Sequence, residues 1–391
     1  MKEHSRPTLA IIGGGQLGML LCKAARDLDV KTIIVVPTVP APAEPFADVT
    51  LVSPLDSKAL AEQIASQADY VTFEFENVPP ALLDGLAEQE KQQRVIVRPG
   101  VDTLKLLQNK ATQKAWLTNH DYPTLGFMDC QQPQAEKQKI LDAIGLPFVQ
   151  KAARGGYDGY GVQIIRSAQE LPNLWDVPSI IEPYIDDPVE LGVVVARTAT
   201  GEMSAFHPVR MTFDRKKNVL DAVHSPTGLG QEIDDAATQL AKDVVNGLND
   251  AGVFAVEMFL LPDSRLVINE ISPRVHNSGH HTVEACQVSQ FDQHVRAVCG
   301  LPLGDPGVSP PAAIMRNLLY TKELDFMMHN PPDSVVSDSE GVYLHWYGKR
   351  EAHEGRKLGH VTCLCSDADE AQQRMDNFIN SLRIPAEEKA T

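Results

Sequence analysis

The sequence predicts an α/β protein of several domains, and three observations support this class. The apolar segment 8–12 runs directly into the glycine-rich segment 13–18 and then into a helical pattern. This order of strand, glycine loop and helix opens many nucleotide-binding domains. A second glycine-rich segment, 152–161, lies between two predicted strands, and an acid-bearing hairpin is predicted over 253–271.

Composition limits the size and the partners of the protein. A length of 391 residues predicts two to three domains, and 43% hydrophobic with 22% charged residues is ordinary for a globular chain. The net charge of −17 argues against a nucleic acid or an anionic membrane as partner. Any phosphate site must therefore be locally cationic.

The sequence also predicts a cytoplasmic location. Residues 1–7 lack the apolar core of a signal peptide, and no run of eighteen apolar residues occurs. The six cysteines are scattered and form no zinc-ligand or disulfide framework, which is typical of a reducing compartment.

The first glycine loop, Gly-Gly-Gly-Gln-Leu-Gly at 13–18, matches the dinucleotide fingerprint. The acid that would hold a ribose is missing, because the predicted strand 31–36 ends in Pro-Thr-Val-Pro. An NAD-dependent oxidoreductase is therefore disfavoured. The loop still indicates a helix N-terminus that holds an anion, and the alternative is that the glycines serve only the tight turn.

The next strand, predicted over 70–76, alternates and carries Glu74 and Glu76 on one face. Acids at the carboxyl end of a parallel strand lie where open α/β sheets bind ligands. The alternative is a solvated strand end. A single helix is predicted over 101–119, with Lys110 and Lys114 on one face, a spacing typical of a solvated surface.

The second glycine-rich segment has four glycines in seven residues and follows Lys151. Its backbone N–H groups can fold over phosphates, and Lys151 would add a cation, although no Walker motif is present. The next predicted strand, 179–185, contains Glu182 and is followed by Glu190.

The most informative segment is the hairpin that contains Glu257 and Glu270. A turn centred between Asp263 and Ser264 would make these two acids direct cross-strand neighbours, with side chains about 5 Å apart. Two carboxylates at that separation repel, so a shared proton or a hard cation such as Mg²⁺ is expected between them. The alternative is an exposed hairpin with two solvated glutamates. Arg274 and His276, immediately downstream, favour a site.

Several motifs follow one another in a distinctive order: GGGQLG, EFEN, a lysine before GGYDG, EPYI, NEISPRVHNSGH, YGK and GRKLGH. In this order they resemble the ATP-grasp superfamily and, within it, the N5-carboxyaminoimidazole ribonucleotide synthase family of bicarbonate-using ligases. The resemblance covers about residues 8–365. It implies a doubly wound N-terminal domain at 1–100, a linker helix and small lid at 101–190, a large α+β domain at 191–312 and a β-rich extension at 313–391.

The resemblance implies an activity and roles for individual residues. The reaction would be the ATP-dependent carboxylation of 5-aminoimidazole ribonucleotide by bicarbonate, through carboxyphosphate, with Mg²⁺, in a homodimer. Glu257 and Glu270 would bind Mg²⁺, while Arg274, His276 and Lys151 would be catalytic. The expected ATP-binding residues are Lys110, Lys151, Glu182, Pro183, Tyr184, Ile185, Glu190 and Asn269. The expected substrate-binding residues are Gln16, Glu76, Tyr157, Asp158, Arg274, His276, Lys349 and Arg356.

The basic residues of the C-terminal piece flank a predicted turn. Lys349 ends one predicted strand and Arg356 opens the next, which would make a clamp for a monophosphate, although basic turns are often only solvated. His280 and His281 are expected to be structural.

Two positions depart from the family pattern. Tyr160 stands where an Arg or Lys is usual, and Arg210-Met211-Thr212-Phe213 replaces a segment with Asn and His. These departures favour one alternative function, a weakened nucleotide-binding regulator. The other alternative is a formate- or amino-acid-using ligase of the ATP-grasp superfamily.

Overall fold

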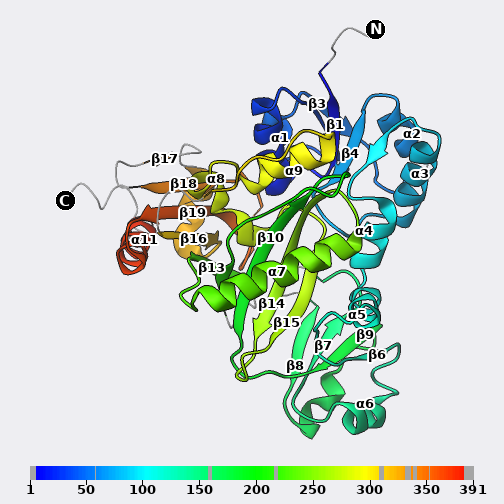
Figure 1. Cartoon of the computed structure of the whole chain (residues 1–391), viewed down its shortest axis with the longest axis vertical. Coiled ribbons are helices and arrows are strands. Elements are labelled where there is room, and N and C mark those ends of the chain that lie inside the picture. The colour runs from blue at the N-terminus through cyan, green and yellow to red at the C-terminus, as the bar shows by residue number, and fades with distance from the viewer. Residues whose placement is uncertain are drawn as a thin grey trace.

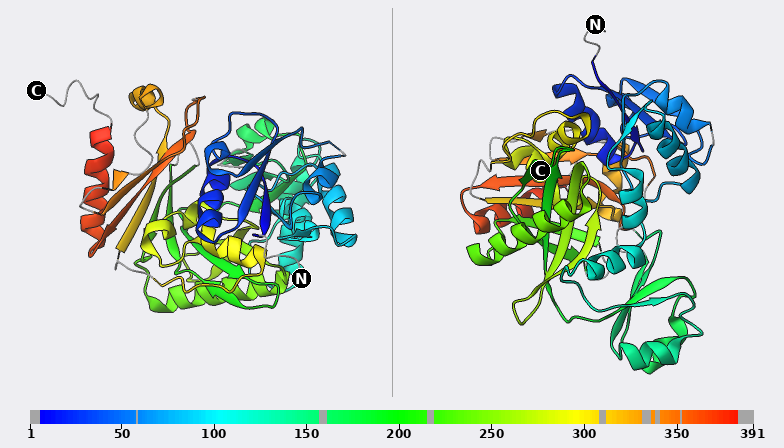
Figure 2. Two further views of the ribbon diagram at one scale, coloured as in Figure 1. Left: turned by 90° about the horizontal axis from the view of Figure 1, so that it is seen from above. Right: turned by 45° about the vertical axis from the view of Figure 1, so that its right-hand side comes forward.

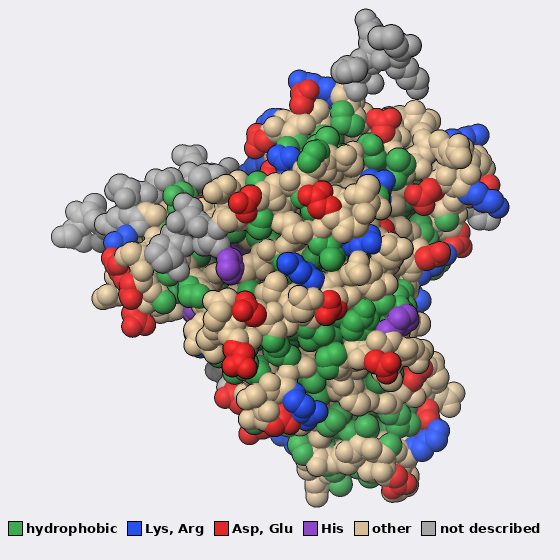
Figure 3. Space-filling model, viewed as in Figure 1, with side chains coloured by type: hydrophobic (Ala, Val, Ile, Leu, Met, Phe, Trp, Pro, Cys, Tyr) green, Lys and Arg blue, Asp and Glu red, His purple; other side chains and the backbone are tan. Residues whose placement is uncertain are grey.

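The computed structural model describes residues 6–57, 59–156, 161–214, 219–307, 312–330, 336–337, 341–351 and 353–382. These residues form three sheets with helices packed on them (Figure 1). Acidic and basic side chains are interspersed over the face shown in Figure 3. No helix among these residues is long and apolar enough to span a membrane.

The N-terminal domain is a five-stranded parallel sheet in the order β3-β2-β1-β4-β5, which is the predicted doubly wound fold. Its strands are β1 (Thr8–Ile12), β2 (Lys31–Val36), β3 (Val49–Val52), β4 (Tyr70–Phe73) and β5 (Ile96–Val97). Its helices are α1 (Gln16–Asp27), α2 (Leu60–Ala65) and α3 (Pro80–Lys91). The strand order reverses between β1 and β4, so the loops after these strands meet at the switch point where such sheets bind ligands.

Two helices, rather than the one predicted, connect this domain to the rest. They are α4 (Val101–Leu107) and α5 (Lys110–Asn119). The break lies at Asn109, whose side-chain oxygen accepts a hydrogen bond from the Ala111 N–H at 2.9 Å. This N-cap begins a new helix at Lys110.

The lid is a four-stranded antiparallel sheet that projects from the body of the protein (Figures 1 and 2). Its strand order is β6-β9-β7-β8. The elements are β6 (Met128–Cys130), α6 (Lys137–Ala143), β7 (Phe148–Ala152), β8 (Val162–Ile165) and β9 (Ser179–Pro183). A small core of its own, which includes Ile140, Phe148 and Ile181, holds the lid together.

The large domain is built on a ten-stranded antiparallel sheet, of which nine strands form the path β15-β14-β10-β12-β13-β16-β19-β18-β17 and β11 pairs with β10. The strands are β10 (Val189–Arg197), β11 (Met203–Ala205), β12 (Val209–Asp214), β13 (Val219–Ser225), β14 (Gly252–Leu260), β15 (Leu266–Ser272), β16 (Ala312–Leu319), β17 (Val336–Ser337), β18 (Val342–Trp346) and β19 (Lys357–Cys365). The helices are α7 (Gln231–Leu248), α8 (Thr282–Ala285), α9 (Gln290–Cys299), α10 (Asp325–His329) and α11 (Ala368–Leu382). The C-terminal strands thus continue the sheet of the large domain.

The N-terminal and large domains share one apolar core. It joins side chains of β1, α1 and β2 to side chains of β10, β14 and α9. The Thr72 hydroxyl on β4 also contacts His294 Nε2 on α9 at 2.7 Å. This packing holds the carboxyl end of β4 close to the loop that follows β15.

Candidate active site

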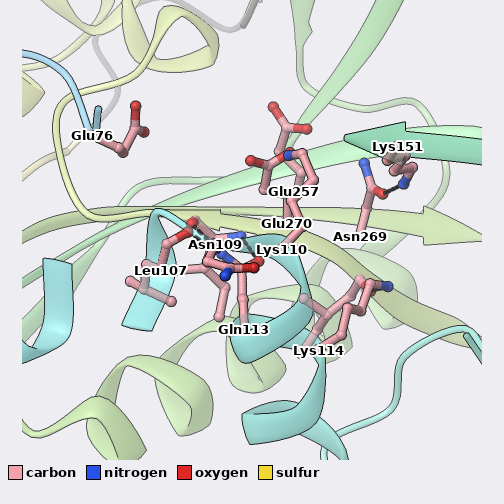
Figure 4. Close-up of polar contacts among 12 residues, drawn as sticks. Glu76, Leu107, Asn109, Lys110, Gln113, Lys114, Lys151, Glu257, Asn269 and Glu270 are labelled. Atoms are coloured by element: carbon pink, nitrogen blue, oxygen red, sulfur yellow. Dashed lines mark hydrogen bonds and ion pairs between the residues drawn. The ribbon is translucent and has the colours of Figure 1, made fainter. Parts of the chain in front are cut away.

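The β14–β15 hairpin brings the two predicted acids together, because Glu257 and Glu270 are register partners. The predicted centre of the turn is wrong, however. Leu260 pairs with Leu266, which centres the turn on Asp263, and a bulge that leaves Asn269 unpaired then restores the alignment of the acids. Bulges re-aim side chains. Here Asn269 points toward the lid, where its Oδ1 accepts a hydrogen bond from Lys151 Nζ at 2.8 Å (Figure 4).

The two facing carboxyls have different electrostatic surroundings. Burial, together with the neighbouring Glu270 and Glu190, raises the pKa of Glu257 to about 8. Burial also acts on Glu270, but the Lys110 ammonium, 2.5 Å from its Oε2, outweighs this and holds the pKa of Glu270 below its usual value. His276 Nε2 lies 3.4 Å from Glu257 Oε1. Glu270 is therefore the member of the pair that ionises readily, whereas Glu257 retains its proton up to a higher pH.

Helix α5 covers the free edge of β15, the last strand of the sheet. The Gln113 side chain acts like a neighbouring strand, donating to the Ile271 carbonyl at 3.0 Å and accepting from the Ile271 N–H at 2.8 Å. Lys114 Nζ donates to the Ile268 carbonyl at 3.4 Å. A solvated Lys114 was the wrong expectation, because only 2% of its side chain is exposed.

A buried ion triad joins α5 to the lid. Glu182 on β9 places one carboxylate oxygen 2.6 Å from Lys114 Nζ and the other 2.7 Å from Lys151 Nζ on β7. Burial opposes the charge of Glu182, but Lys151 and Lys114 outweigh this effect and lower the pKa of Glu182 to about 2. Glu182 was expected only among the ATP-binding residues, and the contacts of its side chain with two buried lysines were not predicted.

A pocket lies where the three domains meet. It is lined by residues after β4, by the α4–α5 junction, by the root of the lid loop and by β15: Glu76, Asn77, Leu107, Gln108, Lys110, Ala153, Arg154, Gly155, Gly156, Glu270 and Ile271. The Lys110 N–H donates to the Ala153 carbonyl at 2.9 Å, which fastens the lid loop to α5. The predicted substrate-binding residues Tyr157 and Asp158, and the departure at Tyr160, lie outside the described residues.

The other predicted residues of the lid and its hinge also lie near this centre. Pro183 ends β9, and the Tyr184 N–H that follows donates to the Pro147 carbonyl at 3.2 Å. Ile185 continues into the hinge before β10. Burial raises the pKa of Glu190 to about 7, although Lys151 acts in the opposite direction.

The loop after β15 positions Arg274 and His276. Arg274 Nε contacts Glu76 Oε1 at 2.8 Å, which ties this loop to the N-terminal domain. The Gln290 amide holds the backbone of His276 from both sides, at 2.9 Å for the N–H and 2.7 Å for the carbonyl. His276 Nδ1 lies 2.9 Å from the Ser278 hydroxyl. His280 and His281 are buried, as expected for structural residues.

The glycine-rich loop at 13–18 already has an anion, the Glu74 carboxylate. It accepts hydrogen bonds from the Gly15 N–H at 2.6 Å and the Leu17 N–H at 3.2 Å. A Cβ at Gly13 or Gly15 would meet this carboxylate, so these glycines are needed for its close approach. Glu74 is buried, which contradicts the solvated alternative, and burial raises its pKa.

The predicted phosphate clamp lies at one end of the β18–β19 pair, where Trp346 is the register partner of Gly359. Lys349 lies over the Tyr347 ring, with its Nζ 5.6 Å from the ring centroid. Its positive charge lowers the pKa of Glu74 and so opposes the effect of burial. Arg356 Nη1 lies 3.4 Å from Glu351, whose side chain is 89% exposed. Glu74 thus links the C-terminal extension electrostatically to the first glycine loop, in which Gln16 begins α1.

Comparison with known families covers most of the chain. Residues 7–108 match the ribonucleotide synthetase preATP-grasp domain, and residues 115–291 match the ATP-grasp domain. Residues 313–374 match the phosphoribosylaminoimidazole carboxylase C-terminal domain.

Individual relatives extend over nearly the whole sequence. The chain is 35% identical to N5-carboxyaminoimidazole ribonucleotide synthase of Synechococcus elongatus over 369 residues, 93% of this chain and 91% of that protein. It is 33% identical to the chloroplastic phosphoribosylaminoimidazole carboxylase of Vigna aconitifolia over 94% of this chain, but it spans only 66% of that longer protein. A crystal structure of N5-carboxyaminoimidazole synthase from Aspergillus clavatus, in complex with ADP and 5-aminoimidazole ribonucleotide, superposes with a TM-score of 0.85. That structure is 27% identical and covers 97% of this chain and 99% of its own.

Proposed function

The chain belongs to the N5-carboxyaminoimidazole ribonucleotide synthase family, and we propose that it carries out that family's reaction. This is the ATP-dependent carboxylation of 5-aminoimidazole ribonucleotide by bicarbonate, which gives N5-carboxyaminoimidazole ribonucleotide, ADP and phosphate in purine biosynthesis. The observation that carries the proposal is the meeting of the lid, the β14–β15 hairpin and the loop after β15 at one centre. There the Glu257/Glu270 pair, Lys151 of the lid and the Arg274–His276 loop lie together.

The ATP site is assigned to the lid and the hairpin. Lys110 and Lys151 supply cations for the phosphates, the main chain from Glu182 to Ile185 supplies donors and acceptors for adenine, and Glu190 supplies a carboxyl for the ribose. Glu257 and Glu270 fit Mg²⁺, because two facing carboxylates are hard oxygen ligands whose repulsion a divalent cation relieves. Bound Mg²⁺ would offset the charge of the phosphates during phosphoryl transfer.

Bicarbonate activation is assigned to the loop after β15. Phosphorylated bicarbonate is a mixed anhydride that needs a cationic environment with little water. Arg274 offers a fixed fork of donors to its carboxylate, once Glu76 gives up part of its contact. His276, held by Gln290 and Ser278, is placed to accept or donate a proton near Glu257.

The ribonucleotide site is assigned to residues of the N-terminal domain and of the C-terminal extension. Gln16 and Glu76 approach it from the carboxyl ends of β1 and β4, and Lys349 and Arg356 approach from the β18–β19 end. Tyr157 and Asp158 complete the proposed set. Because Glu74 fills the first glycine loop, the substrate phosphate is assigned to Lys349 and Arg356.

Three further proposals concern the whole protein. We assign the domains to 1–100, 101–190, 191–312 and 313–391, of which the last two share one sheet. We also propose a homodimer in the cytoplasm. A dinucleotide oxidoreductase does not fit, because the Glu74 carboxylate takes the N–H groups that a pyrophosphate would need.

The function is tested by measuring ADP release from Mg-ATP with bicarbonate and 5-aminoimidazole ribonucleotide. Release that requires all three substrates supports the proposal. Release with formate or an amino acid in place of bicarbonate would favour another ATP-grasp ligase. Nucleotide binding without turnover would favour the regulator, the reading suggested by Tyr160 and Met211.

A further inference from the structure

Three charged side chains are buried side by side between helix α5 and the lid. The exposed fractions of the side chains are 2% for Lys114, 1% for Glu182 and 12% for Lys151. Glu182 contacts one ammonium group with each of its two oxygens, at 2.6 Å and 2.7 Å. Two lysines and one glutamate leave a net charge of +1.

Of the three charged groups, Lys151 is the one whose ammonium reaches beyond the cluster. Lys114 is enclosed: its ammonium donates to the Thr124 hydroxyl at 2.6 Å and lies 3.4 Å from the Ile268 carbonyl. Thr124 in turn donates to the same carbonyl at 2.8 Å. Lys151 instead points out of the cluster toward Asn269, on the hairpin of the proposed metal ligands (Figure 4).

Burying Lys114 needs a reason other than stability. Withdrawing an ion from water costs several kcal/mol, and buried ion pairs are often no more stable than apolar replacements. Without Lys114, the Glu182 carboxylate would pair with Lys151 alone. The lysine that faces the nucleotide would then belong to a neutral pair.

We propose that Lys114 is a positioning residue for the nucleotide. Lys114 binds one oxygen of the Glu182 carboxylate and neutralises part of its charge, so that the positive charge of Lys151 stays available for the phosphates. The inference rests on the proposed function, because it takes Lys151 as an ATP ligand. It assigns a role to a lysine that does not itself reach the substrate.

The first test is the affinity for ADP, measured by calorimetry at pH 7 without turnover. Lys114→Met should weaken ADP binding about 10-fold to 100-fold, the range expected when a charged hydrogen bond is compromised. The KM for the ribonucleotide should stay within about twofold. Lys105→Met is the matched control, because Lys105 lies on α4 and pairs with Asp84 outside the cluster. It should bind ADP like the wild type.

The second test separates charge from packing. The double variant Lys114→Met, Glu182→Gln removes one positive and one negative charge, so the net charge of the cluster returns to +1. It should recover most of the lost ADP affinity. A purely structural role predicts the opposite, because the double variant removes more contacts than the single one.

A pH series gives a readout in the unmodified protein. Burial lowers the pKa of Lys114 to about 8, although Glu182 on β9 raises it, while Lys151 on β7 lowers it and Glu270 on β15 raises it. Loss of this proton should act like the Met substitution, so wild-type ADP affinity should fall between pH 7 and pH 9. Lys114→Arg keeps its charge and should show a smaller fall.

The outcomes are distinguishable. A wild-type protein that binds no ADP overturns the proposed function and this inference with it. Normal ADP binding by both the wild type and Lys114→Met overturns the inference alone. Equal weakening in the single and double variants also overturns it, because packing would then be the cause. If Lys114→Met does not fold, the pH dependence of ADP affinity is compared between the wild type and Lys114→Arg. A smaller fall in Lys114→Arg supports the proposal, and an equal fall overturns it.

Discussion

Replacing Glu257 by glutamine should stabilise the metal-free protein at alkaline pH while it abolishes ATP turnover. The pKa of Glu257 is about 8 in the folded protein, above the ordinary value of 4.5. Between these two values the unfolded chain has released a proton that the folded protein retains. Stability therefore falls as pH rises from about 4.5 to about 8 and stays at its lower value above that. Glutamine removes this loss.

The magnitude follows from the facing geometry. Register partners on an antiparallel pair hold their side chains about 5 Å apart, and two unit charges at that distance repel by about 3 kcal/mol at an effective dielectric near 20. Lys110 beside Glu270 offsets part of this repulsion. We expect a gain of about 1–3 kcal/mol at pH 9 and almost none at pH 5. For a chain of this length that corresponds to roughly 1–4 °C in Tm.

Thermal melting with a chelator at pH 5, 7 and 9 measures the effect. Glu270→Gln is the matched control, because it removes the carboxyl whose pKa is lowered and leaves Lys110 without that partner. A group with a lowered pKa contributes stability above its unfolded pKa, so this variant should melt lower at pH 7 and 9. Opposite signs for the two variants are the expected result. Equal destabilisation at pH 9 would refute the idea that the pair is electrostatically strained.

Two more predictions concern the proposed ribonucleotide site and the glycine loop beside it. The double variant Lys349→Ala, Arg356→Ala should lower kcat/KM for the ribonucleotide by about 10²-fold to 10⁴-fold, with ADP affinity almost unchanged. In competition assays it should also lose most of the preference for the ribonucleotide over its dephosphorylated nucleoside. Discrimination like that of the wild type would place the phosphate elsewhere. Gly15→Ala should lower Tm, because the new Cβ meets the Glu74 carboxylate, whereas Gly126→Ala has no atom within 4 Å and serves as the control. Equal melting of the two glycine variants would contradict the close approach of Glu74.

Glu257 and Glu270 are register partners, as predicted, because two departures from the predicted hairpin offset each other. The turn is centred on Asp263, one half-residue earlier than assumed, and the bulge at Asn269 adds the compensating residue. Alternation alone cannot reveal a bulge, because the insertion is defined by the partner strand. The strong local signals, glycine loops and apolar strands, predicted the doubly wound class and the strands β1, β2 and β4 of the N-terminal domain. They did not predict β3 or α3, and β4 ends at Phe73 instead of residue 76.

The failures are those of long-range contacts. Lys114 has the spacing of a solvated helix face, yet its partner Glu182 is on a lid strand distant in the sequence. Glu74 has the pattern of a strand end, yet the helix N-terminus at Gly15 binds it. In both cases a charged side chain is buried because another element supplies its partner, and a single element read alone contains no sign of that partner.

The pairing also explains how a chain with a net charge of −17 maintains a cationic site. Three of its cations hold a protein carboxylate: Lys110 contacts Glu270, Lys151 contacts Glu182, and Arg274 contacts Glu76. Each cation is therefore kept in place before a substrate arrives, and an incoming phosphate or carboxylate must compete with an internal acid. For Lys110 this exchange has a direct consequence. When its ammonium moves to a phosphate, Glu270 is freed to bind a metal, so nucleotide and metal binding should support each other because both draw on the same ion pair.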